Sequence, residues 1–125
     1  MNKKVLIIYT GGTIGMSKTE HGYAPEMTSF LNKLNKMEEL HDPSLPCWNI
    51  KVMDPILDSS NISVNEWNKI AEMVADNYFY YDGFVILHGT DTMSYSASAL
   101  SFMLENINKP VIFTGSQIPL CEIRN

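Results

Sequence analysis

Residues 82–104 read DGFVILHGTDTMSYSASALSFML and change character twice, so they decide the fold. After a turn-forming Asp-Gly pair, residues 84–87 are uniformly apolar, as in a parallel strand that is buried on both faces. Polar residues follow abruptly at 88–92, and apolar residues then recur at helical spacing. The pattern therefore predicts a buried strand, a polar turn and a helix that begins near Thr92.

The polar turn carries Thr90 and Asp91. In parallel sheets the carboxyl ends of the strands form the edge where ligands bind, because loops converge there and helix starts present free N–H groups. Thr-Asp-Thr is also an ordinary helix-capping sequence. The choice between a ligand site and a simple helix cap depends on whether other strands also lead into polar residues at the same edge of the sheet.

Three further strands are predicted: residues 5–9 and 111–113 from apolar runs, and residues 48–57 from alternation of apolar with other residues. The chain alternates these strands with helix-like segments and contains no linker or repeat. This order predicts one α/β domain, a doubly wound, mostly parallel sheet with helices on both faces.

Two more helices are expected between these strands. One begins at a cap formed by Thr28 or Ser29, and the other has capping-box spacing at Ser63 and Glu66. Residues 15–25 lack an apolar period and contain glycine, proline and charged residues, which predicts a long, exposed and mobile loop. The helix that begins near Ser63 is expected to pack against the sheet with one apolar face, formed by Val64, Trp67, Ala71, Val74 and Tyr78.

All four predicted strands end in polar, mostly hydroxyl-bearing residues. These are Thr10 and Thr13 after the first strand, Asp58, Ser59 and Ser60 after the second, Thr90 and Asp91 after the third, and Ser116 and Gln117 after the fourth. The carboxyl ends of parallel strands share one edge, so four such exits favour a polar small-molecule pocket over four independent caps.

The composition excludes several classes of function. The net charge of −5 and the absence of a Lys or Arg cluster argue against nucleic-acid binding. No apolar run reaches membrane length, and the one near the start is too short for an export signal. Cys47 and Cys121 have no metal-ligand spacing with the histidines, so reduced thiols in the cytoplasm are expected.

The polar residues suggest nucleophilic acyl transfer without a cofactor. The glycines at 11, 12 and 15 match neither dinucleotide-binding nor phosphate-binding loops. Thr13 is a candidate nucleophile if Tyr23 reaches it from the following loop, and N–H groups near Thr90 could stabilise an oxyanion by roughly 3 kcal/mol per donor. His88 could act as a base, but its place at a strand end before a glycine favours a structural role.

Two motifs carry a family resemblance. TGGTIG at 10–15 and HGTDTM at 88–93 resemble the signature motifs of bacterial L-asparaginases, and the chain is most similar to the cytoplasmic type I enzymes. The resemblance implies a flavodoxin- or Rossmann-like N-terminal domain. It further implies that Thr13 attacks the side-chain amide carbon of L-asparagine, releasing ammonia and leaving an aspartyl ester that water hydrolyses. Tyr23 would orient or deprotonate Thr13.

The resemblance also implies the substrate contacts. Asp58, Ser59 and Ser60 match the segment that holds the α-carboxylate of asparagine. Asp91 matches the acid that receives the α-ammonium group, and Thr90 matches the second essential threonine. Whether Thr13 or Thr90 attacks first stays open; Thr13 is favoured because it adjoins the loop and does not have to cap a helix.

Chains of this family are more than twice as long, and their catalytic lysine and smaller C-terminal domain lie beyond the position of Asn125. Residues 1–125 are therefore expected to be an incomplete N-terminal domain with little activity alone, in a protein that forms a homo-oligomer. A glutaminase, the amidase subunit of a tRNA amidotransferase, and a non-catalytic flavodoxin-like binding module remain alternatives.

Overall fold

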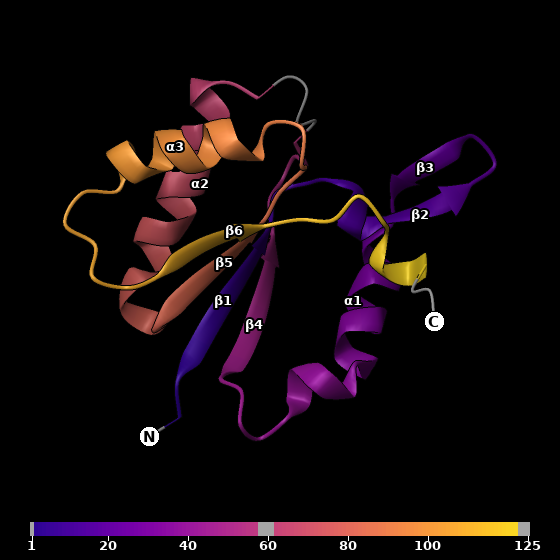
Figure 1. Cartoon of the computed structure of the whole chain (residues 1–125), viewed down its shortest axis with the longest axis horizontal. Coiled ribbons are helices and arrows are strands. Elements are labelled where there is room, and N and C mark those ends of the chain that lie inside the picture. Colours follow the sequence, from indigo (N-terminus) through magenta and orange to yellow (C-terminus); the bar gives the residue numbers. More distant parts are fainter. Residues whose placement is uncertain (1, 58–61, 123–125) are drawn as a thin grey trace.

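The computed structural model describes residues 2–57 and 62–122 and contains a four-stranded parallel sheet in the order β4-β1-β5-β6 (Figure 1). The strands are β1 (Lys4–Tyr9), β4 (Cys47–Val52), β5 (Gly83–Leu87) and β6 (Val111–Thr114). The central strand β5 is the most completely buried, whereas exposure alternates along the edge strands β4 and β6. This difference explains why β5 is a continuous apolar run, whereas apolar and polar side chains alternate along β4.

Helices cover both faces of the sheet, as predicted (Figure 1). They are α1 (Met27–Lys36), α2 (Val64–Asn77) and α3 (Met93–Met103), with short 3₁₀ segments η1 (Thr13–Gly15), η2 (Glu38–His41), η4 (Tyr78–Tyr80) and η5 (Leu120–Glu122). One core cluster joins α2 and α3 to the sheet through Ile70, Val74 and Leu100. A second joins α1 to the opposite face through Phe30 and Leu34.

The strand order reverses direction between β1 and β5. The chain runs from β1 outward to β4 on one side, and then crosses to β5 and β6 on the other. The carboxyl ends of β1 and β5 therefore flank a topological switch point, the position at which open α/β sheets bind their ligands.

The prediction that residues 15–25 form a loop without regular structure was wrong, although the segment is largely exposed, as expected. The segment forms an antiparallel hairpin, β2 (Met16–Thr19) with β3 (Gly22–Pro25), that projects beside α1 (Figure 1). The Thr19 hydroxyl donates to the Gly22 carbonyl at 2.6 Å, which closes the turn. Most of the ribbon is exposed, so it needs no apolar period and leaves no periodic signal in the sequence.

Two boundaries and one packing face also differ from those expected. The cap of α1 is Glu26, whose carboxylate accepts from the Thr28 amide at 3.0 Å, so Thr28 lies inside the helix. Strand β4 ends at Val52 rather than at residue 57. In α2, Val64 of the expected packing face is 60 % exposed, whereas Ile70, which was not expected on that face, is buried.

The capping box expected at the start of α2 is only partly formed. Ser63 is the N-cap, but its hydroxyl donates to the Glu66 carboxylate and makes no side-chain cap to the helix backbone. This hydrogen bond lowers the pKa of Glu66, because it stabilises the ionised carboxylate.

Candidate active site

The segments that leave the four parallel strands meet at the switch point. We call them exits 1 to 4, comprising residues 10–15, 53–57, 88–92 and 115–117. Asp58, Ser59 and Ser60, expected to belong to exit 2, lie outside the described residues.

Exit 1 touches exits 2 and 3 through consecutive glycines with positive φ. A Cβ on Gly11 (φ 151°) would lie 2.3 Å from the Leu57 carbonyl oxygen. A Cβ on Gly12 (φ 104°) would lie 2.7 Å from both the Cα and the N of Gly89. Glycine is required at both positions by backbone conformation and by close approach. These contacts bring the Thr13 loop against the loop that carries Asp91.

Exit 4 joins the same cluster. A Cβ on Gly115 would lie 2.2 Å from the His88 carbonyl oxygen, and Thr90 Cγ2 would be 3.4 Å away. The amide of Leu57 donates to the Thr10 carbonyl at 2.7 Å, which ties exit 2 to exit 1. The predicted convergence of the strand ends is therefore confirmed for the described residues.

The hydroxyl of Thr10 serves the fold. Thr10 is 1 % exposed, and both its amide and its hydroxyl donate to the Leu87 carbonyl, at 3.0 and 2.8 Å. This pair of hydrogen bonds between exit 1 and the end of β5 fixes the origin of the glycine loop. Thr13 lies three residues further on, is only half-buried, and begins η1.

The side chain of Tyr9 contacts the glycine loop of exit 1 and fixes its position. Its hydroxyl donates to the Gly12 carbonyl at 2.7 Å, and a Cβ on Gly15 would lie 2.4 Å from Cζ of its ring. Burial raises the pKa of Tyr9 to about 12, because the phenolate would be poorly solvated. Sequence reasoning placed Tyr9 in the first strand and missed this role; the signal was a tyrosine, rather than an aliphatic residue, at the strand end next to the glycine motif.

Thr90 and Asp91 occupy the turn before α3. The N-cap of that helix is Thr92, as predicted, yet its side chain makes no capping hydrogen bond. Asp91 is exposed and Thr90 is half-buried beside Gly115.

Tyr23 lies on β3, and its side chain is 51 % exposed. Its hydroxyl lies 2.8 Å from both carboxylate oxygens of Glu122, a residue of η5 that follows it by 99 positions. The sequence predicted that Tyr23 approaches Thr13 only if the segment of residues 15–25 closes over the site. In the structure the Tyr23 hydroxyl contacts Glu122. Sequence reasoning missed Glu122, because no local pattern links a residue after the fourth strand to the hairpin.

His88 is 1 % exposed, and one ring nitrogen, Nδ1, lies 2.8 Å from the Gly89 carbonyl oxygen. Its ring packs beside Phe113, with centroids 6.0 Å apart. Burial lowers the pKa of His88, because the imidazolium would lose its hydration. These surroundings favour the structural role expected for this residue.

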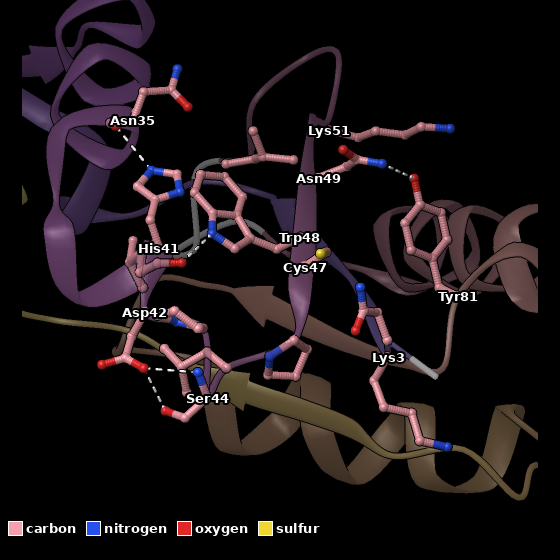
Figure 2. A pocket seen from close by; sticks show the side chains of 16 residues that line it. Lys3, Asn35, His41, Asp42, Ser44, Cys47, Trp48, Asn49, Lys51 and Tyr81 are labelled. Carbon is pink, nitrogen blue, oxygen red and sulfur yellow. Dashed lines mark hydrogen bonds between the residues drawn. The ribbon is translucent and has the colours of Figure 1, made fainter.

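A large open hollow lies away from the switch point. An open cleft of about 1110 Å³ runs along the edge strand β4, and Figure 2 shows its side chains. Several are already paired with one another: Asn49 donates to the Tyr81 hydroxyl at 2.9 Å, and the Ser44 hydroxyl donates to Asp42 at 2.7 Å. None of its lining residues belongs to exits 1 to 4. We therefore place the site at the switch point.

Residues 2–57 and 62–122 contain no group of three His, Cys, Asp or Glu side chains arranged to hold a metal ion. No helix in this part of the chain has the length and apolar character needed to cross a bilayer.

Comparisons with known proteins identify the family. Residues 4–125 match the family model "Asparaginase, N-terminal". The chain is 54 % identical over 123 residues to L-asparaginase 1 of Escherichia coli, covering 98 % of this chain and 36 % of that protein. The crystal structure of L-asparaginase I from Vibrio cholerae superposes with a TM-score of 0.92 at 52 % identity, covering 99 % of this chain and 37 % of that one.

Relatives with other names match as well. A glutamyl-tRNA(Gln) amidotransferase subunit of Thermoplasma acidophilum is 36 % identical over 120 residues, which cover 93 % of this chain and 28 % of that protein. The chain spans little more than a third of the length of the Escherichia coli and Vibrio cholerae L-asparaginases. From its sequence, its sheet topology and the match over residues 4–125 to the model of the N-terminal domain, this chain belongs to the asparaginase family.

Proposed function

We propose that the protein hydrolyses L-asparagine to L-aspartate and ammonia through an aspartyl ester on Thr13. The observation that carries the proposal is the backbone contact between Gly12 and Gly89, which brings the loops of Thr13 and Asp91 together. The relatives named L-asparaginase support the choice of substrate. Because the chain spans about a third of their length, this activity is proposed for the complete protein.

The first half of the reaction is attack by the Thr13 hydroxyl oxygen on the side-chain amide carbon. A threonine hydroxyl is a weak nucleophile, so a second group has to accept its proton. Tyr23 on the adjoining hairpin is the candidate, because its own phenolic proton can pass to the Glu122 carboxylate 2.8 Å away. Backbone N–H groups near Thr90 would stabilise the oxyanion, by roughly 3 kcal/mol per donor. The C–N bond then breaks and ammonia leaves with the transferred proton.

In the second half, water attacks the aspartyl ester. The C–O bond to Thr13 breaks, aspartate is released and the threonine hydroxyl is restored. The same oxyanion donors serve both halves, because the two tetrahedral intermediates carry their negative charge at the same oxygen. No cofactor is required by this chemistry.

Substrate recognition is assigned to the remaining exits. Asp91 would pair with the α-ammonium group of asparagine, since an exposed carboxylate can bind a cation through charge-assisted hydrogen bonds. Asp58, Ser59 and Ser60 would bind the α-carboxylate. They directly follow Leu57, whose carbonyl oxygen lies against Gly11.

We further propose that the complete protein acts in the cytoplasm as a homo-oligomer. Its catalytic lysine is proposed to lie outside the 125 residues, in the part of the relatives that this chain does not cover. Residues 1–125 alone are therefore expected to release little or no ammonia from asparagine.

Ammonia release from L-asparagine and L-glutamine by the protein expressed from its complete reading frame tests this proposal. We expect turnover of asparagine, and its loss in Thr13→Ala while aspartate still binds. Thr13→Ser retains a hydroxyl and serves as the matched control, with partial activity. Ammonia release at the wild-type rate by Thr13→Ala would contradict the assignment of the nucleophile.

A further inference from the structure

The hydrogen bond between Tyr23 and Glu122 links two parts of the chain that sequence reasoning left separate. Each carboxylate oxygen of Glu122 lies 2.8 Å from the Tyr23 hydroxyl. Glu122 lies on η5, which packs against η1, β2 and α1. The segment after β6 therefore continues from exit 4 to the hairpin and to η1, the element that begins with Thr13 (Figure 1).

The hydroxyl of Tyr23 carries a single proton, and this limits the hydrogen bonds that it can make besides the one to Glu122. A tyrosine hydroxyl carries one proton and two acceptor lone pairs, whereas an ionised carboxylate only accepts. At neutral pH the single proton of Tyr23 therefore points to Glu122. Any other group that meets the Tyr23 oxygen finds only lone pairs, so a hydroxyl that approaches it has to donate.

We propose that Glu122 is a positioning residue that makes Tyr23 a hydrogen-bond acceptor toward Thr13. The inference rests on the proposed function. With its proton held by Glu122, Tyr23 takes a hydrogen bond from the Thr13 hydroxyl, which turns a lone pair of Thr13 toward the amide carbon. A hydrogen bond to an ionised acceptor is roughly twice as strong as a neutral one, so it also holds the hairpin against η5.

Glu122→Gln separates this role from simple packing. The glutamine side chain has nearly the same shape, but it is uncharged, and its NH₂ group can donate to the Tyr23 oxygen and occupy the lone pair meant for Thr13. We expect kcat to fall about tenfold, which corresponds to about 1.4 kcal/mol. KM should change little, because Glu122 is not assigned a contact with the substrate.

Glu20→Gln is the matched control, since it removes an exposed carboxylate from the turn of the same hairpin. Its kcat should equal that of the wild type. Glu122→Asp keeps the charge on a shorter side chain and should recover part of the lost kcat. Equal thermal stability of the three variants would exclude a general loss of folding.

A double-mutant cycle with Tyr23→Phe decides the mechanism. The loss caused by Glu122→Gln should disappear when the Tyr23 hydroxyl is absent, whereas a purely structural role of Glu122 would persist. In parallel, the ¹³Cζ resonance of Tyr23, assigned by its loss in Tyr23→Phe, should shift in Glu122→Gln and not in Glu20→Gln.

The outcomes separate the two proposals. An active wild-type protein whose Glu122→Gln variant keeps its full kcat contradicts the role of Glu122 alone. A Glu122→Gln effect of equal size in the Tyr23→Phe background contradicts it as well. A wild-type protein that releases no ammonia from asparagine contradicts the proposed function, and with it the catalytic consequence of the Tyr23–Glu122 bond.

Discussion

Gly12 and Gly89 meet backbone to backbone, so closely that a Cβ on Gly12 would lie 2.7 Å from the N and the Cα of Gly89. This contact joins the ends of β1 and β5 at the switch point. Both loops of the candidate site depend on it, because Thr13 follows one of the glycines by a single position and Asp91 follows the other by two.

Gly12→Ala should therefore damage both the fold and the site. The new methyl group would meet backbone that cannot rotate away, and φ would remain at 104°. We expect a loss of about 2–4 kcal/mol in the free energy of unfolding and the loss of nearly all activity. Urea unfolding and ammonia release measure the two effects.

Gly22→Ala is its matched control. Gly22 has a similar φ of 100°, but a Cβ there would have no heavy atom within 4 Å. Its cost should be limited to backbone strain of about 1–2 kcal/mol. Equal destabilisation by the two substitutions would mean that the contact with Gly89 contributes nothing.

Tyr9→Phe tests the support beneath the glycine loop. The substitution preserves the ring, which packs 5.1 Å from Phe30 between centroids, but removes the hydrogen bond to the Gly12 carbonyl. We expect a loss of about 1–2 kcal/mol in stability and a lower kcat, because exit 1 is no longer held in place. Tyr80→Phe, at a residue that is 73 % exposed, should change stability by less than about 0.5 kcal/mol.

The same tyrosine predicts a pH dependence of stability. The pKa of Tyr9 is raised from 10.0 in the unfolded chain to about 12 in the folded protein. Between these values the unfolded state releases the proton and the folded state keeps it. The stabilisation is thus complete below pH 10 and is lost as the pH rises toward 12.

Tyr9→Phe lacks this titration. Its free energy of unfolding should fall less steeply between pH 10 and 12 than that of the wild type, although other tyrosines and lysines titrate in both proteins. Chemical unfolding at several pH values gives the two slopes. Parallel slopes would show that Tyr9 has the same pKa in the folded and unfolded states.

Asp91→Asn tests recognition of the α-ammonium group. Loss of the charge should raise KM for asparagine about 10- to 100-fold, as expected for a charge-assisted hydrogen bond. Succinamate, which has the same side-chain amide but no α-amino group, should be turned over with similar kcat/KM by the variant and the wild type. A loss of equal size with both substrates would remove Asp91 from this role.

The sequence could predict the sheet and the meeting of the strand exits because buried parallel strands and glycine-rich turns leave local signals. The run at β5 and the glycines at 11 and 12 are such signals. The hairpin β2–β3 could not be found in the same way, because an exposed ribbon closed by the Thr19–Gly22 bond has no apolar period.

Two other features could not be predicted, because one joins residues far apart in the sequence and the other depends on which of several neighbouring side chains caps a helix. The Tyr23–Glu122 bond joins residues 99 positions apart and has no counterpart in local pattern. Glu26, rather than Thr28, caps α1 because its carboxylate reaches the Thr28 amide, so the helix starts earlier than hydroxyl preference suggests. The roles of Asp58, Ser59 and Ser60 remain predictions, since they lie outside the described residues.

The central claim is that Thr13 forms the covalent bond to the substrate. Rapid acid quenching of the complete protein during turnover of L-asparagine, followed by peptide mass spectrometry, locates the aspartyl ester. The account predicts the ester on Thr13, and none in Thr13→Ala. An ester on Thr90, with Thr13 unmodified, would contradict it.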